Sequence, residues 1–305
     1  MLFWIIKISG LLFLWFILNY FTFLLQSDRE MKDYITSLIP KNIEYNIQEV
    51  QNKNNIIINK IEFFSSEIKL GQAKLKYPDN NNIKPAILLL GGIWTGMNAV
   101  NLTGNDDDIL IISPDYDYQV KNKYTIWRIF SDLYSAHQAL YYQIRNNLLI
   151  LNYLQNINHV DSDRISIIGY SFGVPFAVAT SAIINNFHSM VLVYGGANLQ
   201  KILNKNIKLD NKVFDFFLKK ILWMHIKNFE PMRHSRNIQN KRVLLINGDK
   251  DQKIPNECAE ELHSLFEYKP VVHWLNSKHV RLENIELNNI IISKIKTWYK
   301  KNNFY

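Results

Sequence analysis

The stretch Gly169-Tyr170-Ser171-Phe172-Gly173 decides the fold, because its G-x-S-x-G pattern directly follows the apolar run Ile165-Ser166-Ile167-Ile168. A strand that ends in a sharp turn and continues as a helix holds such a serine in an exposed position at the amino end of the helix. Glycines on both sides allow the backbone to bend this tightly. We interpret the stretch as a strand–turn–helix junction that presents the Ser171 hydroxyl, rather than as a glycine-rich turn with an incidental serine.

Six short apolar runs indicate the strands of a mostly parallel central sheet, because unbroken runs of this length are typical of strands covered on both faces. The runs are 86–90, 109–113, 165–169, 190–194, 243–247 and 271–275. Helical patterns lie between and after them, at 125–156 (long enough for two helices), 174–185, 256–266 and 281–299. This alternation predicts an α/β fold with right-handed βαβ units and helices on both faces of the sheet.

Three further segments complete the predicted domain, which extends over residues 55–305. Residues 55–64 and 68–76 are rich in β-branched and aromatic residues and predict two antiparallel strands. Residues 197–238 contain helical patterns and no strand, and we interpret them as a cap insertion after the sixth strand. Its aromatic residues indicate either ordinary helix packing or an apolar lid over the site. They are Phe214, Phe216, Phe217, Trp223 and Phe229.

The composition and charge of the chain exclude several kinds of site and partner. The chain of 305 residues is 48% apolar, enough for a large core, and its only cysteine, Cys258, excludes an intramolecular disulfide and a thiolate-rich metal site. The net charge of +8 is scattered, without the basic stripe of a nucleic-acid reader, so we expect no nucleic-acid partner. A mildly basic solvated surface, or one attracted to anionic lipid headgroups, fits this charge. We expect neither a metal nor a cofactor, and the sequence leaves the oligomeric state open.

Residues 1–27 predict a membrane anchor, and residues 28–54, which are polar, predict a tether leading to the domain. From Ile8 to Leu25 the chain has no charged residue and is just long enough to cross a bilayer. A cleaved signal peptide is the alternative, but the run lacks a small-residue cleavage site and is long for a signal. We therefore expect a single-pass, uncleaved N-terminal transmembrane helix. Lys7 on one side and Arg29 on the other leave its orientation open.

A serine hydroxyl needs a base to take its proton and an acid to orient that base. Asp249 and Asp251 both follow the strand 243–247, and we favour Asp251, which lies further from the strand end, toward the next helix. His279 lies beyond the carboxyl end of the strand 271–275, at the sheet edge where Ser171 lies. His273 is within that strand and is interpreted as structural.

An oxyanion formed at Ser171 needs fixed N–H donors. We expect one to be the backbone N–H of Phe172, directly after the serine. The other is expected from the loop after the strand 86–90, as the backbone N–H of Ile93, with Trp94 as the second choice.

These motifs resemble those of the α/β-hydrolase superfamily from about residue 55 to 302. The resemblance rests on four segments in family order, with the triad order Ser, Asp, His. They are Leu89-Leu90-Gly91-Gly92, the G-x-S-x-G stretch, Gly248-Asp249-Lys250-Asp251, and His279. The approach 160–169 is similar to that of the dienelactone-hydrolase-like and prolyl-oligopeptidase-like branches. The chain departs from the family in having Gly91-Gly92 where a His-Gly is usual, and Ser171 where true dienelactone hydrolases have a thiol.

The resemblance implies that Ser171 is the nucleophile, Asp251 the acid and His279 the base. It also implies hydrolysis of esters, thioesters or amides without a cofactor. Together with the N-terminal segment, this predicts a membrane-anchored serine hydrolase that cleaves carboxylic-ester or thioester bonds of a small-molecule or lipid-like acyl substrate. An acyltransferase or a peptidase on the same triad, or a non-catalytic binding module with this fold, are the alternatives.

Overall fold

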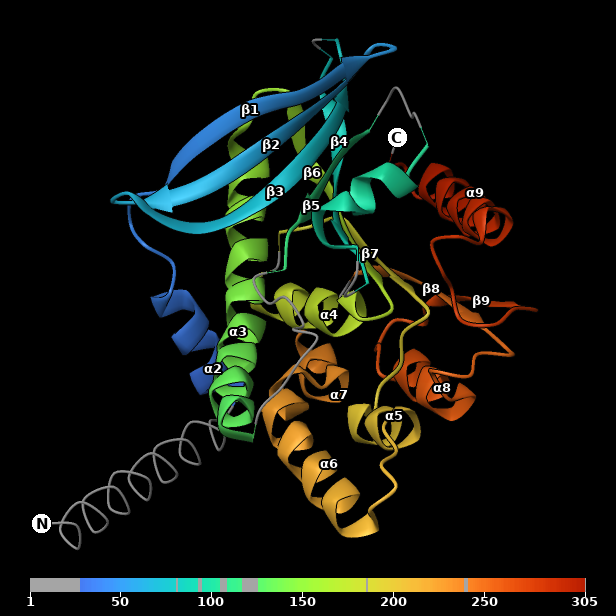
Figure 1. Cartoon of the computed structure of the whole chain (residues 1–305). Coiled ribbons are helices and arrows are strands. Elements are labelled where there is room, and N and C mark those ends of the chain that lie inside the picture. Colours follow the sequence, from blue (N-terminus) through green and yellow to red (C-terminus); the bar gives the residue numbers. More distant parts are fainter. Residues whose placement is uncertain are drawn as a thin grey trace, which may run out of the picture.

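A computed structural model describes residues 28–80, 82–92, 95–104, 109–116, 126–184, 186–238 and 241–304. Its centre is a nine-stranded sheet with the order β1-β2-β3-β5-β4-β6-β7-β8-β9 (Figure 1). The strands are β1 (Glu44–Lys53), β2 (Ile56–Ser65), β3 (Ile68–Pro78), β4 (Lys84–Leu90), β5 (Leu110–Pro114), β6 (Val160–Tyr170), β7 (Ser189–Val193), β8 (Arg242–Gly248) and β9 (Val271–Leu275). The strands from β4 to β9 pair in parallel, and β1, β2 and β3 are antiparallel additions beside β5.

The six apolar runs coincide with β4 to β9, so the prediction of a mostly parallel sheet is confirmed. The strands β4, β5, β7 and β8 are fully or largely buried because helices cover both faces of the sheet, whereas the edge strand β9 is only partly buried. The covering elements outside the insertion are α2 (Asp28–Ser37), η1 (Gly96–Leu102), α3 (Ile126–Asn156), α4 (Gly173–Ile183), α8 (Asn256–Ser264) and α9 (Ile285–Lys301). One apolar core lies between the sheet and α3 with α4, and a second lies between the sheet and α9 with η1. The pattern 125–156 forms one helix, α3, rather than two.

Residues 28–54 differ from the predicted polar tether, because they form α2 and β1. The helix α2 is amphipathic and inserts Met31 and Ile35 into the first core, where both side chains are buried. The strand β1 pairs with β2 at the edge of the sheet, and every one of its residues is exposed. The strand is exposed and mostly polar, with Tyr45, Ile47 and Val50 as its apolar residues, and its composition therefore resembles that of a linker.

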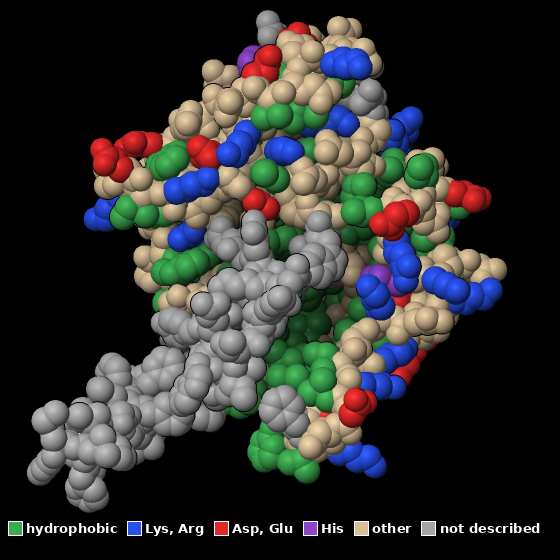
Figure 2. All heavy atoms as spheres, viewed as in Figure 1, with side chains coloured by type: hydrophobic (Ala, Val, Ile, Leu, Met, Phe, Trp, Pro, Cys, Tyr) green, Lys and Arg blue, Asp and Glu red, His purple; other side chains and the backbone are tan. Residues whose placement is uncertain are grey.

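The predicted insertion is helical and follows β7, which is the seventh strand rather than the sixth because β1 precedes the others. Its elements are α5 (Leu199–Asn206), α6 (Lys212–Ile226), η2 (Lys227–Phe229), α7 (Pro231–His234) and η3 (Ser235–Asn237). Phe229 is buried against Tyr141 and Phe176, whereas Phe216 and Phe217 on α6 are 58% and 59% exposed. Figure 2 shows hydrophobic side chains gathered over α6 on this face of the molecule.

The predicted membrane anchor, residues 1–27, lies outside the described residues. Among the residues that are described, no helix combines the length and the apolar character that a bilayer crossing requires.

Candidate active site

Ser171 occupies a tight turn between β6 and α4. Its φ is +49°, in the left-handed region that L-residues rarely adopt, and its N–H donates to the carbonyl oxygen of Val193 at 2.8 Å. The turn requires Gly173, because a Cβ at that position would lie 2.1 Å from the carbonyl oxygen of Leu90. Gly173 therefore allows a close approach between the turn and the neighbouring strand, and Gly169 allows one between the end of β6 and α4. The strained backbone presents the hydroxyl above the sheet edge.

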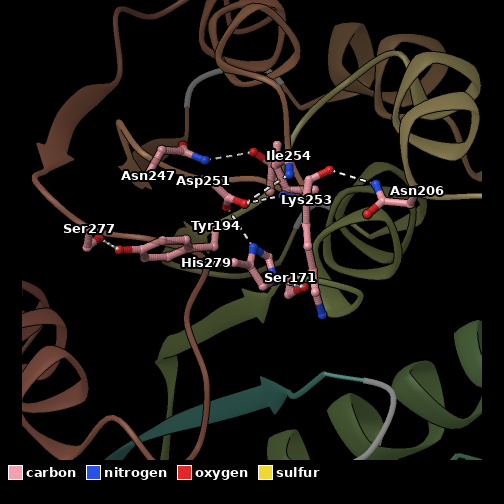
Figure 3. A network of polar contacts seen from close by, with 10 residues as sticks. Ser171, Tyr194, Asn206, Asn247, Asp251, Lys253, Ile254, Ser277 and His279 are labelled. Atoms are coloured by element: carbon pink, nitrogen blue, oxygen red, sulfur yellow. Dashed lines mark hydrogen bonds and ion pairs between the residues drawn. The ribbon is translucent and has the colours of Figure 1, made fainter.

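The three residues predicted as a triad form one chain of hydrogen bonds (Figure 3). Ser171 Oγ lies 2.8 Å from His279 Nε2, and His279 Nδ1 lies 2.6 Å from Asp251 Oδ2. The side chains of His279 and Asp251 are 8% and 2% exposed, so water has little access to the bond between them. A low local dielectric strengthens this bond. The bond to Asp251 in turn favours the imidazole tautomer with its proton on Nδ1, so that Nε2 can accept the serine proton.

The backbone of the loop after β8 aims the Asp251 carboxylate. Its Oδ1 accepts from the N–H groups of Lys253 at 2.7 Å and Ile254 at 3.0 Å, which leaves Oδ2 directed at His279. The other candidate acid, Asp249, is exposed and accepts instead from the N–H of Ser277 at 3.2 Å. The structure thus places Asp251 in contact with His279. Asp249 instead supports the loop that carries His279, through its bond with the N–H of Ser277.

The predicted structural histidine, His273, lies within β9, where it pairs in register with Ile246. Burial lowers the pKa of its imidazole, which favours the neutral form. The structure therefore places this histidine in the sheet, and His279 in the loop beyond it.

Of the two predicted oxyanion donors, the structure describes one. Phe172 caps the amino end of α4, so its N–H lies beside Ser171 at the positive end of the helix dipole. Ile93 and the second choice, Trp94, lie outside the described residues. The glycines before them are held from both sides, since Tyr116 donates its hydroxyl to the Gly91 carbonyl and Thr95 Oγ1 donates to the Gly92 carbonyl at 2.6 Å.

Sequence analysis missed two tyrosines that position this site. Tyr116 follows β5 at the same sheet edge, and its ring packs edge-on against Phe172 at 5.7 Å. Tyr194 follows β7, hydrogen-bonds the Ser277 hydroxyl, and presents its ring at right angles to the His279 imidazole at 5.8 Å. Burial raises the pKa of both phenols, so both stay protonated donors. Their position at carboxyl ends of parallel strands was the signal available in the sequence.

Polar contacts hold the insertion together and join it to the loop that carries Asp251. Glu230 is buried and accepts from the N–H groups of Asn198 at 2.8 Å and Leu199 at 2.6 Å, and burial raises the pKa of its carboxyl. Asn206 donates to the carbonyl of Lys253, in the loop that carries Asp251, at 2.7 Å. No side chain that the structure describes in the insertion lines the cavity beside Ser171, which favours ordinary helix packing over an apolar lid.

A cavity of about 970 Å³ opens beside Ser171 and His279 and continues between the sheet, η1 and α9. Within the described ranges, no three His, Cys, Asp or Glu side chains come together in a way that could hold a metal ion.

A mostly parallel sheet that carries a Ser–His–Asp chain of hydrogen bonds at its carboxyl edge defines an α/β hydrolase. Residues 111–277, more than half of the chain, match the dienelactone hydrolase family. The chain belongs to this family, and it is a hydrolase of the esterase type. A search of curated proteins finds no match.

Solved structures share the fold at low sequence identity. Acetyl xylan esterase 1 from a Thermoanaerobacterium species superposes with a TM-score of 0.65 at 13% identity, over 87% of this chain and 92% of that one. The acetyl xylan esterase from a Paenibacillus species gives 0.65 at 13% identity, over 88% and 93%. An esterase from Pyrococcus furiosus gives 0.51 at 15% identity, over 90% and 95%.

Proposed function

We propose that this protein is a serine hydrolase that cleaves carboxylic-ester or thioester bonds through an acyl-enzyme at Ser171. The observation that carries the proposal is the unbroken chain from Ser171 Oγ through both ring nitrogens of His279 to Asp251. The Ser171 hydroxyl needs a base, which His279 supplies. The imidazolium that then forms needs a buried anion, which Asp251 supplies. The esterase activities named for the structural neighbours agree with this chemistry.

The geometry supports a two-step reaction. His279 Nε2 takes the proton of Ser171 Oγ as this oxygen attacks the carbonyl carbon, and Asp251 stabilises the resulting imidazolium. The N–H of Phe172, with that of Ile93 as the second donor, stabilises the negative charge on the carbonyl oxygen. His279 then gives the proton to the leaving alcohol or thiol. In the second step His279 activates water, which attacks the acyl carbon and releases the acid and the free serine.

Hydrolysis of p-nitrophenyl acetate by the wild-type protein and by Ser171→Ala tests this proposal. We expect turnover by the wild type and a loss of at least about 10⁴-fold in kcat for the variant, because removing the nucleophile leaves only the residual effect of binding and the oxyanion donors. Equal rates for the two folded proteins would contradict the assignment of Ser171.

We further propose that residues 1–27 anchor the enzyme in a membrane as a single-pass helix, because this segment combines sufficient length with apolar character and carries Trp4 near its amino end. Full-length protein should remain in membranes after alkaline carbonate extraction. The double variant Leu14→Arg, Leu18→Arg should be released, since each arginine near the centre of a span costs about 2.5 kcal/mol or more. Retention of the double variant would contradict the anchor.

A further inference from the structure

The cavity beside Ser171 runs beneath the sheet rather than over its edge. Its wall on the sheet side consists of apolar side chains that all point to the face covered by η1 and α9. They are Ile87 and Leu89 from β4, Ile109 and Ile111 at β5, and Ile168 from β6. The wall from α9 includes Ile292, Ile295 and the ring of Tyr299. A mainly hydrocarbon surface therefore leads away from the candidate nucleophile.

The two faces of the same strands differ in packing. On the face covered by α3 and α4, Leu88, Leu90 and Ile112 have no exposed surface. On the opposite face, the neighbouring residues Ile87 and Ile111 are each 5% exposed. The element beside β4 and β5 on this face is η1, a seven-residue 3₁₀ helix, and the cavity lies between it and α9. Protein interiors are normally close-packed, so an apolar cavity of this volume has the size of a ligand site.

The length of the cavity can be estimated from β6 and α9, which contact each other at the end of the cavity far from Ser171. Ile87 is in register with Ser166, and the Tyr299 hydroxyl donates to Ser166 Oγ at 2.7 Å. Ser166 lies on β6 five residues before Ser171, which begins the turn after the strand, so the two are separated by up to about 17 Å. Along α9, the lining from Asn284 to Tyr299 extends over about 22 Å of helix. A fully extended chain advances about 1.2 Å per bond, so a chain of about 12 carbons, which spans about 13 Å, fits within about 17 Å.

We propose that this cavity is the acyl-binding channel of the enzyme and that the enzyme prefers esters of linear fatty acids of about 12 carbons over acetate esters. This inference rests on the proposed function, because it takes the acyl carbonyl to be bound at Ser171. The methyl end of the chain lies between Ile87 and Tyr299, and the ester group remains at the mouth beside His279. The alcohol or thiol half of the substrate stays outside the channel.

The channel predicts a specific dependence on chain length. Each methylene that moves from water into an apolar wall should raise kcat/KM about fourfold. For p-nitrophenyl esters from acetate to hexadecanoate, kcat/KM should rise with each added pair of carbons to about 12 and then level off or fall. A decline from acetate onward would overturn the channel and leave the proposed hydrolysis intact.

A matched pair of variants on α9 tests where the acyl chain of the substrate is bound. Ile292 is half-buried and lines the cavity midway along the helix, whereas Ile290 is exposed on the same helix outside it. Ile292→Trp should lower the ratio of kcat/KM for dodecanoate to that for acetate at least about 50-fold, because the indole displaces several methylenes. Ile290→Trp should keep the wild-type ratio. Equal ratios in the two variants would overturn the channel.

Direct binding separates this inference from the proposed function. Isothermal titration of the full-length protein with dodecanoate, below its critical micelle concentration, should show saturable binding with one site. Ile292→Trp should weaken this binding at least tenfold, and Ile290→Trp should not. If no ester is hydrolysed but this binding pattern appears, the proposed function fails and the channel stands. Absence of binding, or equal binding by both variants, overturns the channel.

Discussion

Asp251 is bound to His279 through one carboxylate oxygen, at 2.6 Å, while its other oxygen is fixed by two backbone N–H groups of its own loop. Because the backbone fixes the carboxylate, its direction does not depend on substrate. The imidazole is thereby held with Nε2 facing Ser171, which is the preorganisation that the proposed acyl transfer requires.

The first prediction concerns the choice between the two aspartates. Asp251→Asn should lower kcat for p-nitrophenyl acetate by about 10³- to 10⁴-fold, because an amide donor beside Nδ1 favours the wrong imidazole tautomer. Asp249→Asn, two residues away and exposed, should stay within about threefold of wild type. The measurement is steady-state kinetics on both folded variants. A larger loss for Asp249→Asn than for Asp251→Asn would reverse the assignment.

The second prediction concerns Tyr116, which binds the carbonyl of Gly91 just before the predicted oxyanion donor. Tyr116→Phe keeps the ring that packs on Phe172 but removes the donor. We expect kcat to fall about tenfold, a modest part of what loss of a direct oxyanion donor costs, with KM nearly unchanged. Tyr268→Phe, at an exposed position, is the control. An unchanged kcat, or an effect on KM alone, would show that Tyr116 does not position this loop.

The third prediction concerns Glu230, which joins the two ends of the insertion. Glu230→Gln replaces a buried charged acceptor of backbone N–H groups by an amide with only one acceptor oxygen. We expect the free energy of unfolding to fall by about 2 kcal/mol, the range for hydrogen bonds to a charged group. Glu257→Gln, which removes an exposed ion pair with Lys201, should leave the free energy of unfolding nearly unchanged, because solvent screens the pair. Urea denaturation compares the two, and equal losses would refute the role of Glu230.

The fourth prediction concerns acid stability. Burial lowers the pKa of His137 and of His225 to about 4, and their rings lie 5.0 Å apart between α3 and the insertion. The unfolded chain binds these protons near pH 6.5, so between pH 6.5 and about 4 the unfolded state holds more protons than the folded state. Stability is therefore fully present above pH 6.5 and falls on acidification, by up to about 1.4 kcal/mol per pH unit for each histidine.

Chemical denaturation at pH 7.5, 6 and 5 measures this slope. His137→Gln removes one titrating group and should make the slope shallower than in the wild type. An equally steep slope in the variant would show that His137 does not contribute.

The parallel sheet could be predicted from the sequence because each signal was local, and the same signals selected the candidate site residues that the structure brings together. Ser171, Asp251 and His279 each follow an apolar run, and parallel strands bring such positions to one edge. The strand β1 was not predicted because it is exposed and mostly polar. Tyr194 was not predicted because a tyrosine at the end of a buried strand resembles a core residue. The cavity was not predictable at all, since it depends on how η1 and α9 pack against the sheet, and no single segment encodes that arrangement.

Reaction of the full-length protein with a fluorophosphonate, followed by mass spectrometry of the labelled peptide, tests the central claim most directly. A hydroxyl activated by a base is the group that such a reagent modifies. We predict one stoichiometric adduct, on Ser171, that is absent from Ser171→Ala and strongly slowed in His279→Ala. A folded wild-type protein without label, or a label on any residue other than Ser171, would contradict the account.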